Sequence, residues 1–153
     1  MKKEVEKLLQ YVQKPARYIG GELNAVVKDK DKIDIRYAFC FPDTYEIGMS
    51  HLGMKILYGL VNDREDSWCE RVFAPNNDME EQLRKNNVPL FALESCDYIK
   101  DFDMIGFTLQ YELSYTNVLN MLNLAQIPLK SSDRENLTPL ICVGGPCACN
   151  PEP

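Results

Sequence analysis

The residues best suited to ligand binding lie in one polar, glycine-containing segment, residues 43–53, which follows the apolar run ending at Phe41. Carboxylate, hydroxyl and imidazole groups beside glycine can hydrogen-bond a ligand and let it approach the backbone. The candidates are Asp43, Tyr45, Glu46, Gly48, Ser50 and His51. Asp43 can equally cap a turn, and His51, the single histidine, can equally be a partly exposed residue at a helix start.

Two later segments carry further candidates directly after apolar runs. They are Thr108 and Gln110 after the first run, and Gly144 and Gly145 after the second. Residues without Cβ allow a flat macrocycle or a nucleotide tail to lie against the backbone. Three side chains near the first run can line the same cleft or form a helix-capping turn with aromatic packing: Tyr111, Glu112 and Tyr115.

The six cysteines divide into two groups. Three lie in or beside apolar runs and are expected to be buried core thiols: Cys40, Cys69 and Cys96. The other three crowd the C-terminal region: Cys142, Cys147 and Cys149. A closed structural zinc site takes four ligands, and three nearby thiols are too few for one, so no metal site is predicted here.

Strand and helix patterns alternate from residue 33 onward, which indicates βαβ units and a mostly parallel sheet. Strands are predicted at 33–41, 69–74, 89–93, 104–109 and 140–143, and helices at 5–12, 50–61, 77–86 and from Ser114, which can cap its own helix. The extended run 23–27 can pair with the first strand as an N-terminal hairpin. The predicted fold is α/β, a Rossmann-like three-layer sandwich of the flavodoxin-like or cobalamin-binding type with five strands.

The 153 residues correspond to one domain, with a lead-in of residues 1–32 before an α/β unit of residues 33–153. No covering helix follows the last strand, so we expect a piece of a longer polypeptide. A net charge of −6 disfavours direct nucleic-acid binding. No run is long and apolar enough for a signal peptide or a membrane span, which makes the cytoplasm the expected location.

Four phrases of the sequence together resemble one family. They are Arg17-Tyr18-Ile19-Gly20-Gly21-Glu22, Tyr45-Glu46-Ile47-Gly48-Met49-Ser50, Leu109-Gln110-Tyr111-Glu112-Leu113 and Gly144-Gly145-Pro146. The family is the radical SAM proteins with an N-terminal B12-binding-like domain. In addition, Asp43-x-Tyr45-x-x-Gly48 resembles the Asp-x-His-x-x-Gly loop of cobalamin-binding domains, with tyrosine in place of the cobalt-ligating histidine.

The resemblance implies an accessory domain that binds cobalamin without a histidine ligand, or that descends from one that did. It also implies a downstream radical SAM barrel of the same polypeptide, which holds the 4Fe–4S cluster and S-adenosylmethionine. No catalytic residue is expected in this chain. Two alternatives remain open: a flavodoxin-like FMN electron carrier, and a structural module that forms a homodimer. The cofactor interpretation requires the loops at Asp43–Gly48, Thr108 and Gly144–Gly145 to converge at one crevice.

Overall fold

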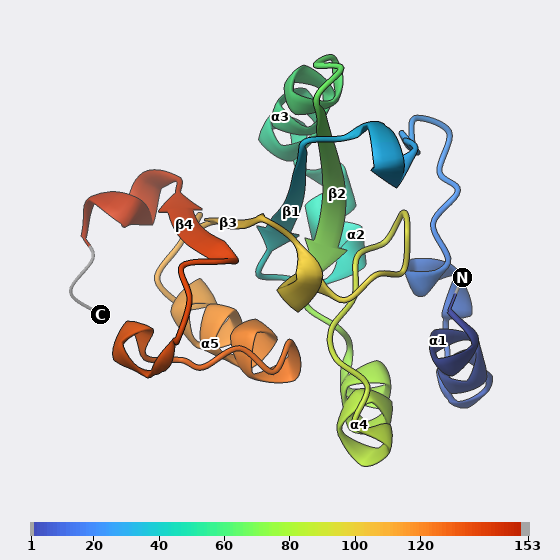
Figure 1. The fold of residues 1–153 in the computed structure, drawn as a ribbon. Coiled ribbons are helices and arrows are strands. Elements are labelled where there is room, and N and C mark those ends of the chain that lie inside the picture. Colours follow the sequence, from blue (N-terminus) through green and yellow to red (C-terminus); the bar gives the residue numbers. More distant parts are fainter. Residues whose placement is uncertain (1, 151–153) are drawn as a thin grey trace.

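A computed structural model of the protein describes residues 2–150, and its centre is a four-stranded, parallel sheet (Figure 1). The strands are β1 (Ile35–Phe41), β2 (Ser67–Phe73), β3 (Met104–Thr108) and β4 (Leu140–Gly144), in the order β2-β1-β3-β4. After β1 the chain adds β2 on one side and then returns to add β3 and β4 on the other. The winding therefore reverses between β1 and β3, and open α/β sheets bind ligands beyond the strand ends at such a point.

Helices and short turns surround this sheet. The α-helices are α1 (Lys3–Leu8), α2 (Tyr45–Ser50), α3 (Leu52–Asn62), α4 (Asn77–Asn86) and α5 (Ser114–Leu124). The 3₁₀ turns are Leu9–Tyr11, Pro15–Tyr18, Lys30–Lys32, Ile99–Asp101, Ser131–Asp133 and Pro146–Cys149. Within residues 2–150, no helix combines the length and the apolar character that crossing a membrane requires.

The two faces of the sheet are buried in separate hydrophobic clusters. On one face, Ala38 and Cys40 of β1 pack with residues of α1, α4 and α5. On the other face, Phe39 and Phe41 pack with Met54 of α3. Successive side chains of a strand point to opposite faces, so the uninterrupted apolar run in β1 supplies both clusters.

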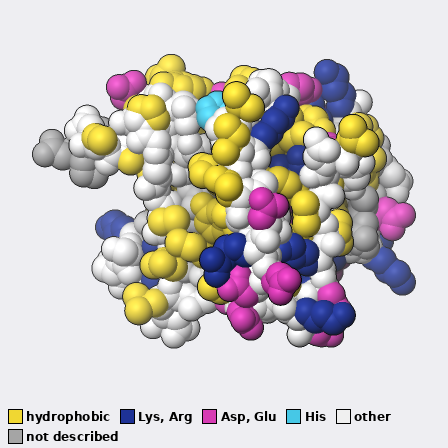
Figure 2. Space-filling view, turned by 90° about the horizontal axis from the view of Figure 1, so that it is seen from above, with side chains coloured by type: hydrophobic (Ala, Val, Ile, Leu, Met, Phe, Trp, Pro, Cys, Tyr) yellow, Lys and Arg dark blue, Asp and Glu magenta, His cyan; other side chains and the backbone are white. Residues whose placement is uncertain are grey.

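One part of the second face, over β3 and β4, carries no helix among the described residues. Tyr37 lies across Gly106 there, since a Cβ added to the glycine would be 1.8 Å from the tyrosine hydroxyl oxygen. Leu140 of β4 is 53% exposed, and Leu57 and Leu60 of α3 are 51% and 59% exposed. Figure 2, viewed from the α3 end of the molecule, shows hydrophobic side chains gathered beside a hollow in the surface.

The predicted N-terminal hairpin is wrong, because residues 23–27 form no strand. Both edges of β1 are already paired in parallel, with β2 and with β3, which leaves no edge for an antiparallel partner. The lead-in is instead held by side chains. The Trp68 indole donates to the Val26 carbonyl at 2.9 Å, and the Val26 amide donates to the Tyr58 hydroxyl at 2.7 Å.

The predicted strand at 89–93 is also wrong, which reduces the sheet from five strands to four. This segment is buried but irregular, and its ladder is a single antiparallel bridge between Phe91 and Tyr98. Pro89 lacks an amide hydrogen, and Leu93 makes one backbone bond to β2, at 2.8 Å from the Arg71 carbonyl. A short apolar run indicates burial, but it does not by itself distinguish a strand from a buried loop.

The other predicted elements are confirmed with shifted boundaries, and three details differ. The first helix ends at Leu8, the predicted helix 50–61 corresponds to α3, and α2 occupies residues 45–50, where a loop was predicted. Ser114 does not cap its helix, since its hydroxyl donates to the Tyr111 carbonyl and Leu113 occupies the capping position. The three cysteines expected in the core are buried: Cys40, Cys69 and Cys96.

Ile105→Ala should lower the free energy of unfolding by about 2–5 kcal/mol, because truncation leaves a cavity at the centre of the sheet. Ile105 is 0% exposed on β3, between β1 and β4. The matched control Ile35→Ala, at a position 46% exposed, should cost less than about 1 kcal/mol. Urea unfolding followed by circular dichroism measures both losses. Equal losses would contradict the interior position of β3.

Candidate functional site

The loop after β1 and the loop after β3 meet at the carboxyl edge of the sheet. The Tyr111 hydroxyl donates to Asp43 Oδ2 at 2.7 Å, and Asp43 Oδ1 accepts from the Thr44 amide at 2.7 Å. The Asn117 side chain of α5 donates to the Pro42 carbonyl at 2.9 Å. Asp43 therefore lies at the winding reversal, as predicted, but both of its carboxylate oxygens have partners within the protein.

The loop after β4 closes onto the end of β3. The Leu109 amide donates to the Gly144 carbonyl at 2.7 Å. Gly145 has φ of +100°, and a Cβ there would lie 2.5 Å from the Leu109 carbonyl oxygen. Glycine is therefore required at residue 145 by contact with the chain's own backbone, whereas an added Cβ at Gly144 would meet nothing within 4 Å.

Thr108 and Gln110 lie between these two loops and bind each other. The Gln110 amide donates to the Thr108 hydroxyl at 2.6 Å, and both residues are half-buried. The structure thus brings together five predicted site residues at one edge of the sheet: Asp43, Thr108, Gln110, Gly144 and Gly145.

Tyr45 belongs to a different set of contacts. Its hydroxyl donates to Glu22 Oε1 at 2.9 Å, and its ring packs edge-on against Phe73 with centroids 5.5 Å apart. Burial and the hydrogen bond to Glu22 raise the pKa of Tyr45 to about 12, so the hydroxyl stays protonated at neutral pH. Tyr45 joins α2 to the lead-in segment.

The remaining candidates of this segment also have structural partners. Two nitrogens of Arg17 donate to Glu46 Oε1 at 2.8 and 2.6 Å, and this bond lowers the pKa of the Glu46 carboxyl. The His51 ring accepts from the Met54 amide at 3.1 Å and caps α3. The Ser50 hydroxyl donates to a carbonyl of its own helix, Ile47 O, at 2.7 Å.

Gly48 is needed for packing, because a Cβ there would lie 2.3 Å from the Phe73 ring.

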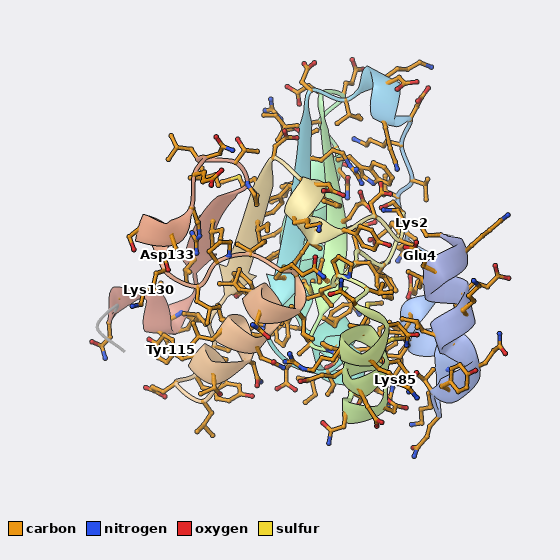
Figure 3. The ribbon with its side chains drawn as sticks, turned by 60° about the horizontal axis from the view of Figure 1, so that its bottom comes forward. Lys2, Glu4, Lys85, Tyr115, Lys130 and Asp133 are labelled. Atoms are coloured by element: carbon orange, nitrogen blue, oxygen red, sulfur yellow. The ribbon has the colours of Figure 1, made fainter. Side chains whose placement is uncertain are left out.

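A second candidate set lies around α5. The Tyr115 hydroxyl of α5 donates to the carbonyls of Cys147 and Asn150 at 3.0 and 2.9 Å (Figure 3). Tyr115 thus anchors the C-terminal turn, whereas Glu112 is exposed.

The residue that the sequence interpretation missed is Arg71, at the centre of a buried ion network. Its side chain is 8% exposed, and it donates to Glu94 at 2.6 Å and to Glu22 at 2.8 Å. Glu94 is fully buried, and this burial raises its pKa despite the neighbouring guanidinium. The available signal was the pair Glu70-Arg71 inside an otherwise apolar strand, since buried charges require partners.

Two cavities flank the carboxyl-edge loops. A cavity of about 340 Å³ lies between the lead-in, α2, α3 and β2, and one of about 250 Å³ lies between α5, β4 and the C-terminal turn. Within residues 2–150, no three His, Cys, Asp or Glu side chains are placed to hold a metal ion. Cys142 and Cys147 are half-buried and Cys149 is exposed.

Tyr45→Phe should lower the free energy of unfolding by about 1.5–3 kcal/mol, because the charged Glu22 loses a hydrogen-bond donor. Tyr11→Phe is the matched control at a position 67% exposed, and it should change stability by less than about 0.5 kcal/mol. Thermal and urea unfolding measure both. A Tyr45→Phe variant as stable as the control would show that the contact with Glu22 contributes nothing.

Comparison with known proteins shows the family to which this chain belongs. Residues 53–153, more than half of the chain, match the family model described as radical SAM proteins, N-terminal. An uncharacterized protein of Methanocaldococcus jannaschii is 27% identical over 110 residues, which cover 72% of this chain and 19% of that relative. The chain thus spans about a fifth of the length of this relative. No solved structure matches the chain. The chain belongs to the family of N-terminal regions of radical SAM proteins.

Proposed function

We propose that this chain is an accessory, non-catalytic domain of a radical SAM enzyme and that it packs against the cluster-bearing part of the same polypeptide. The observation that carries the proposal is the match of residues 53–153 to the N-terminal family. The relative's greater length supports it, because four-fifths of that protein lies outside the matched region.

The chemistry of the enzyme would lie outside this chain. Radical SAM proteins use a 4Fe–4S cluster, which needs cysteine thiolates, together with S-adenosylmethionine. Cys40 and Cys69 are buried on separate strands, and the described residues offer no group of three metal ligands. The thiols of this chain therefore do not fit such a cluster.

The strand order supports a Rossmann-like domain. The order β2-β1-β3-β4 equals the first four positions of the flavodoxin-like order 2-1-3-4-5. In that arrangement a fifth strand would follow β4, and a final helix would cover the open face of β3 and β4. The carboxyl-edge contact between Asp43 and Tyr111 lies at the switch point of this order.

The residues at that switch point do not fit cobalamin held by a protein ligand to cobalt. Tyr45 stands at the histidine position, but its hydroxyl donates to Glu22 of the lead-in. The Asp43 carboxylate already accepts a hydrogen bond from Tyr111, and the Leu109 backbone fills the space beside Gly145. We therefore favour a scaffold descended from a cofactor domain. The comparisons give no support to the FMN carrier or to the purely dimerising module.

The docking surface we propose includes three exposed leucines, Leu57 and Leu60 of α3 and Leu140 of β4. Each of these side chains is about half exposed, at 51%, 59% and 53%. Leu57 and Leu60 lie on α3, and Leu140 begins β4, the edge strand of the sheet. Complete burial of an exposed leucine contributes about 1.5–3 kcal/mol, and covering these half-buried side chains should contribute roughly half of that each. The occupant we propose is the remainder of the radical SAM polypeptide.

The cofactor question has a direct spectroscopic test. After mixing with hydroxocobalamin and desalting, the protein should retain no corrinoid absorbance in the visible spectrum. Tyr45→His should also retain none, because a side chain at this position lies against Glu22 and Phe73. Stoichiometric retention by the wild-type protein would establish cobalamin binding and remove the scaffold proposal.

The docking proposal predicts that the proposed surface is protected from solvent in the longer polypeptide. That polypeptide should also carry the motif Cys-x-x-x-Cys-x-x-Cys outside residues 1–153. Hydroxyl-radical footprinting should label Leu57 and Leu60 several-fold less in that polypeptide than in the isolated chain. Leu137, which is 88% exposed on the connection before β4, is the control and should stay equally reactive. Unchanged labelling of Leu57 and Leu60 would contradict docking at this surface.

A further inference from the structure

The cavity of about 340 Å³ beside α3 contains a glycine that packing does not explain. Gly59 lies in the interior of α3 and lines this cavity, and a Cβ added there would meet nothing within 4 Å. Glycine is, after proline, the least favourable residue in a helix interior. At Gly48, by contrast, the Phe73 ring excludes a side chain. The missing side chain at residue 59 has one structural consequence, which is a larger cavity.

A buried donor lies at the wall of the same cavity. Arg71 Nε donates to Glu94 and Nη2 donates to Glu22, but Nη1 has only the Met49 sulfur, at 3.2 Å. A thioether is a weak acceptor, so neither N–H of Nη1 in this buried guanidinium has a strong partner. Arg71 and Met49 both line the cavity, which places Nη1 within reach of a molecule that enters it.

The surrounding charges restrict what that molecule can be. Two carboxylates, Glu22 and Glu94, pair with Arg71, and Lys55 adds a second positive charge to the lining of the cavity. These four charges sum to zero, so an uncharged carbonyl oxygen would satisfy Nη1 and leave that balance unchanged. The opposite walls are apolar or aromatic, formed by Val26, Met54 and the ring of Tyr58.

We propose that this cavity binds a small, uncharged, aromatic or apolar molecule whose carbonyl oxygen accepts a hydrogen bond from Arg71 Nη1, with its apolar body against Met54 and Tyr58. Gly59 keeps the entrance side of α3 open for it. The volume of the cavity lies in the range of small-molecule sites. This site is separate from the carboxyl-edge loops and from the proposed docking patch, so either proposal can fail without the other.

Isothermal titration calorimetry with indole-3-acetamide tests the proposal. The wild-type protein should bind this amide saturably. Gly59→Phe should abolish binding of the amide by filling the cavity. Gly59→Ala should weaken binding while raising the midpoint of thermal unfolding by about 3 °C, since alanine favours the helix.

Ile56→Phe is the matched control, because Ile56 is 52% exposed on α3 and does not line the cavity. This variant should bind the amide with wild-type affinity. Absence of saturable binding to the wild-type protein would overturn the proposal. So would equal affinities of the wild-type protein and Gly59→Phe.

Discussion

The position of the lead-in segment depends on the buried guanidinium of Arg71. Its side chain is 8% exposed, and it is held between Glu94, which is fully buried, and Glu22, which is 17% exposed. Removing one partner of a buried ion pair typically costs about 3–5 kcal/mol, because the remaining charge is left without compensation. Glu22 must therefore stay near β2, and the lead-in is fixed by charge pairing rather than by strand pairing.

The same network connects segments that are distant in the sequence. Glu22 also accepts from Tyr45 of α2, and Arg17 of the lead-in binds Glu46 of α2. The phrases Arg17–Glu22 and Tyr45–Ser50, which together carry part of the family resemblance, are thus in direct contact. Side chains of the two phrases hydrogen-bond to each other, and these contacts account for the residue types without a bound cofactor.

The sequence predicted those features that follow from local pattern or from general rules of parallel sheets. The alternation in 35–41 and the periodicity of 77–86 correspond to β1 and α4. The meeting of Asp43, Thr108 and Gly144 at one edge follows because parallel strands end on the same side. The buried run 89–93 was misinterpreted, since apolar character reports burial and not backbone pairing. The partners of Tyr45 and Arg71 depended on contacts between distant segments, for which a single sequence has no local signal.

Polar groups with hydrogen-bond partners and exposed apolar groups lie on different surfaces of this domain. At the carboxyl edge, Asp43, Thr108 and Gly145 already contact the protein's own groups, so a ligand there would have to replace existing bonds. Within residues 2–150, the groups without strong partners include half-exposed leucines on α3 and β4, Arg36 Nε and Nη1 of Arg71. Association by apolar packing needs no such replacement, and leucine burial contributes favourable free energy outright.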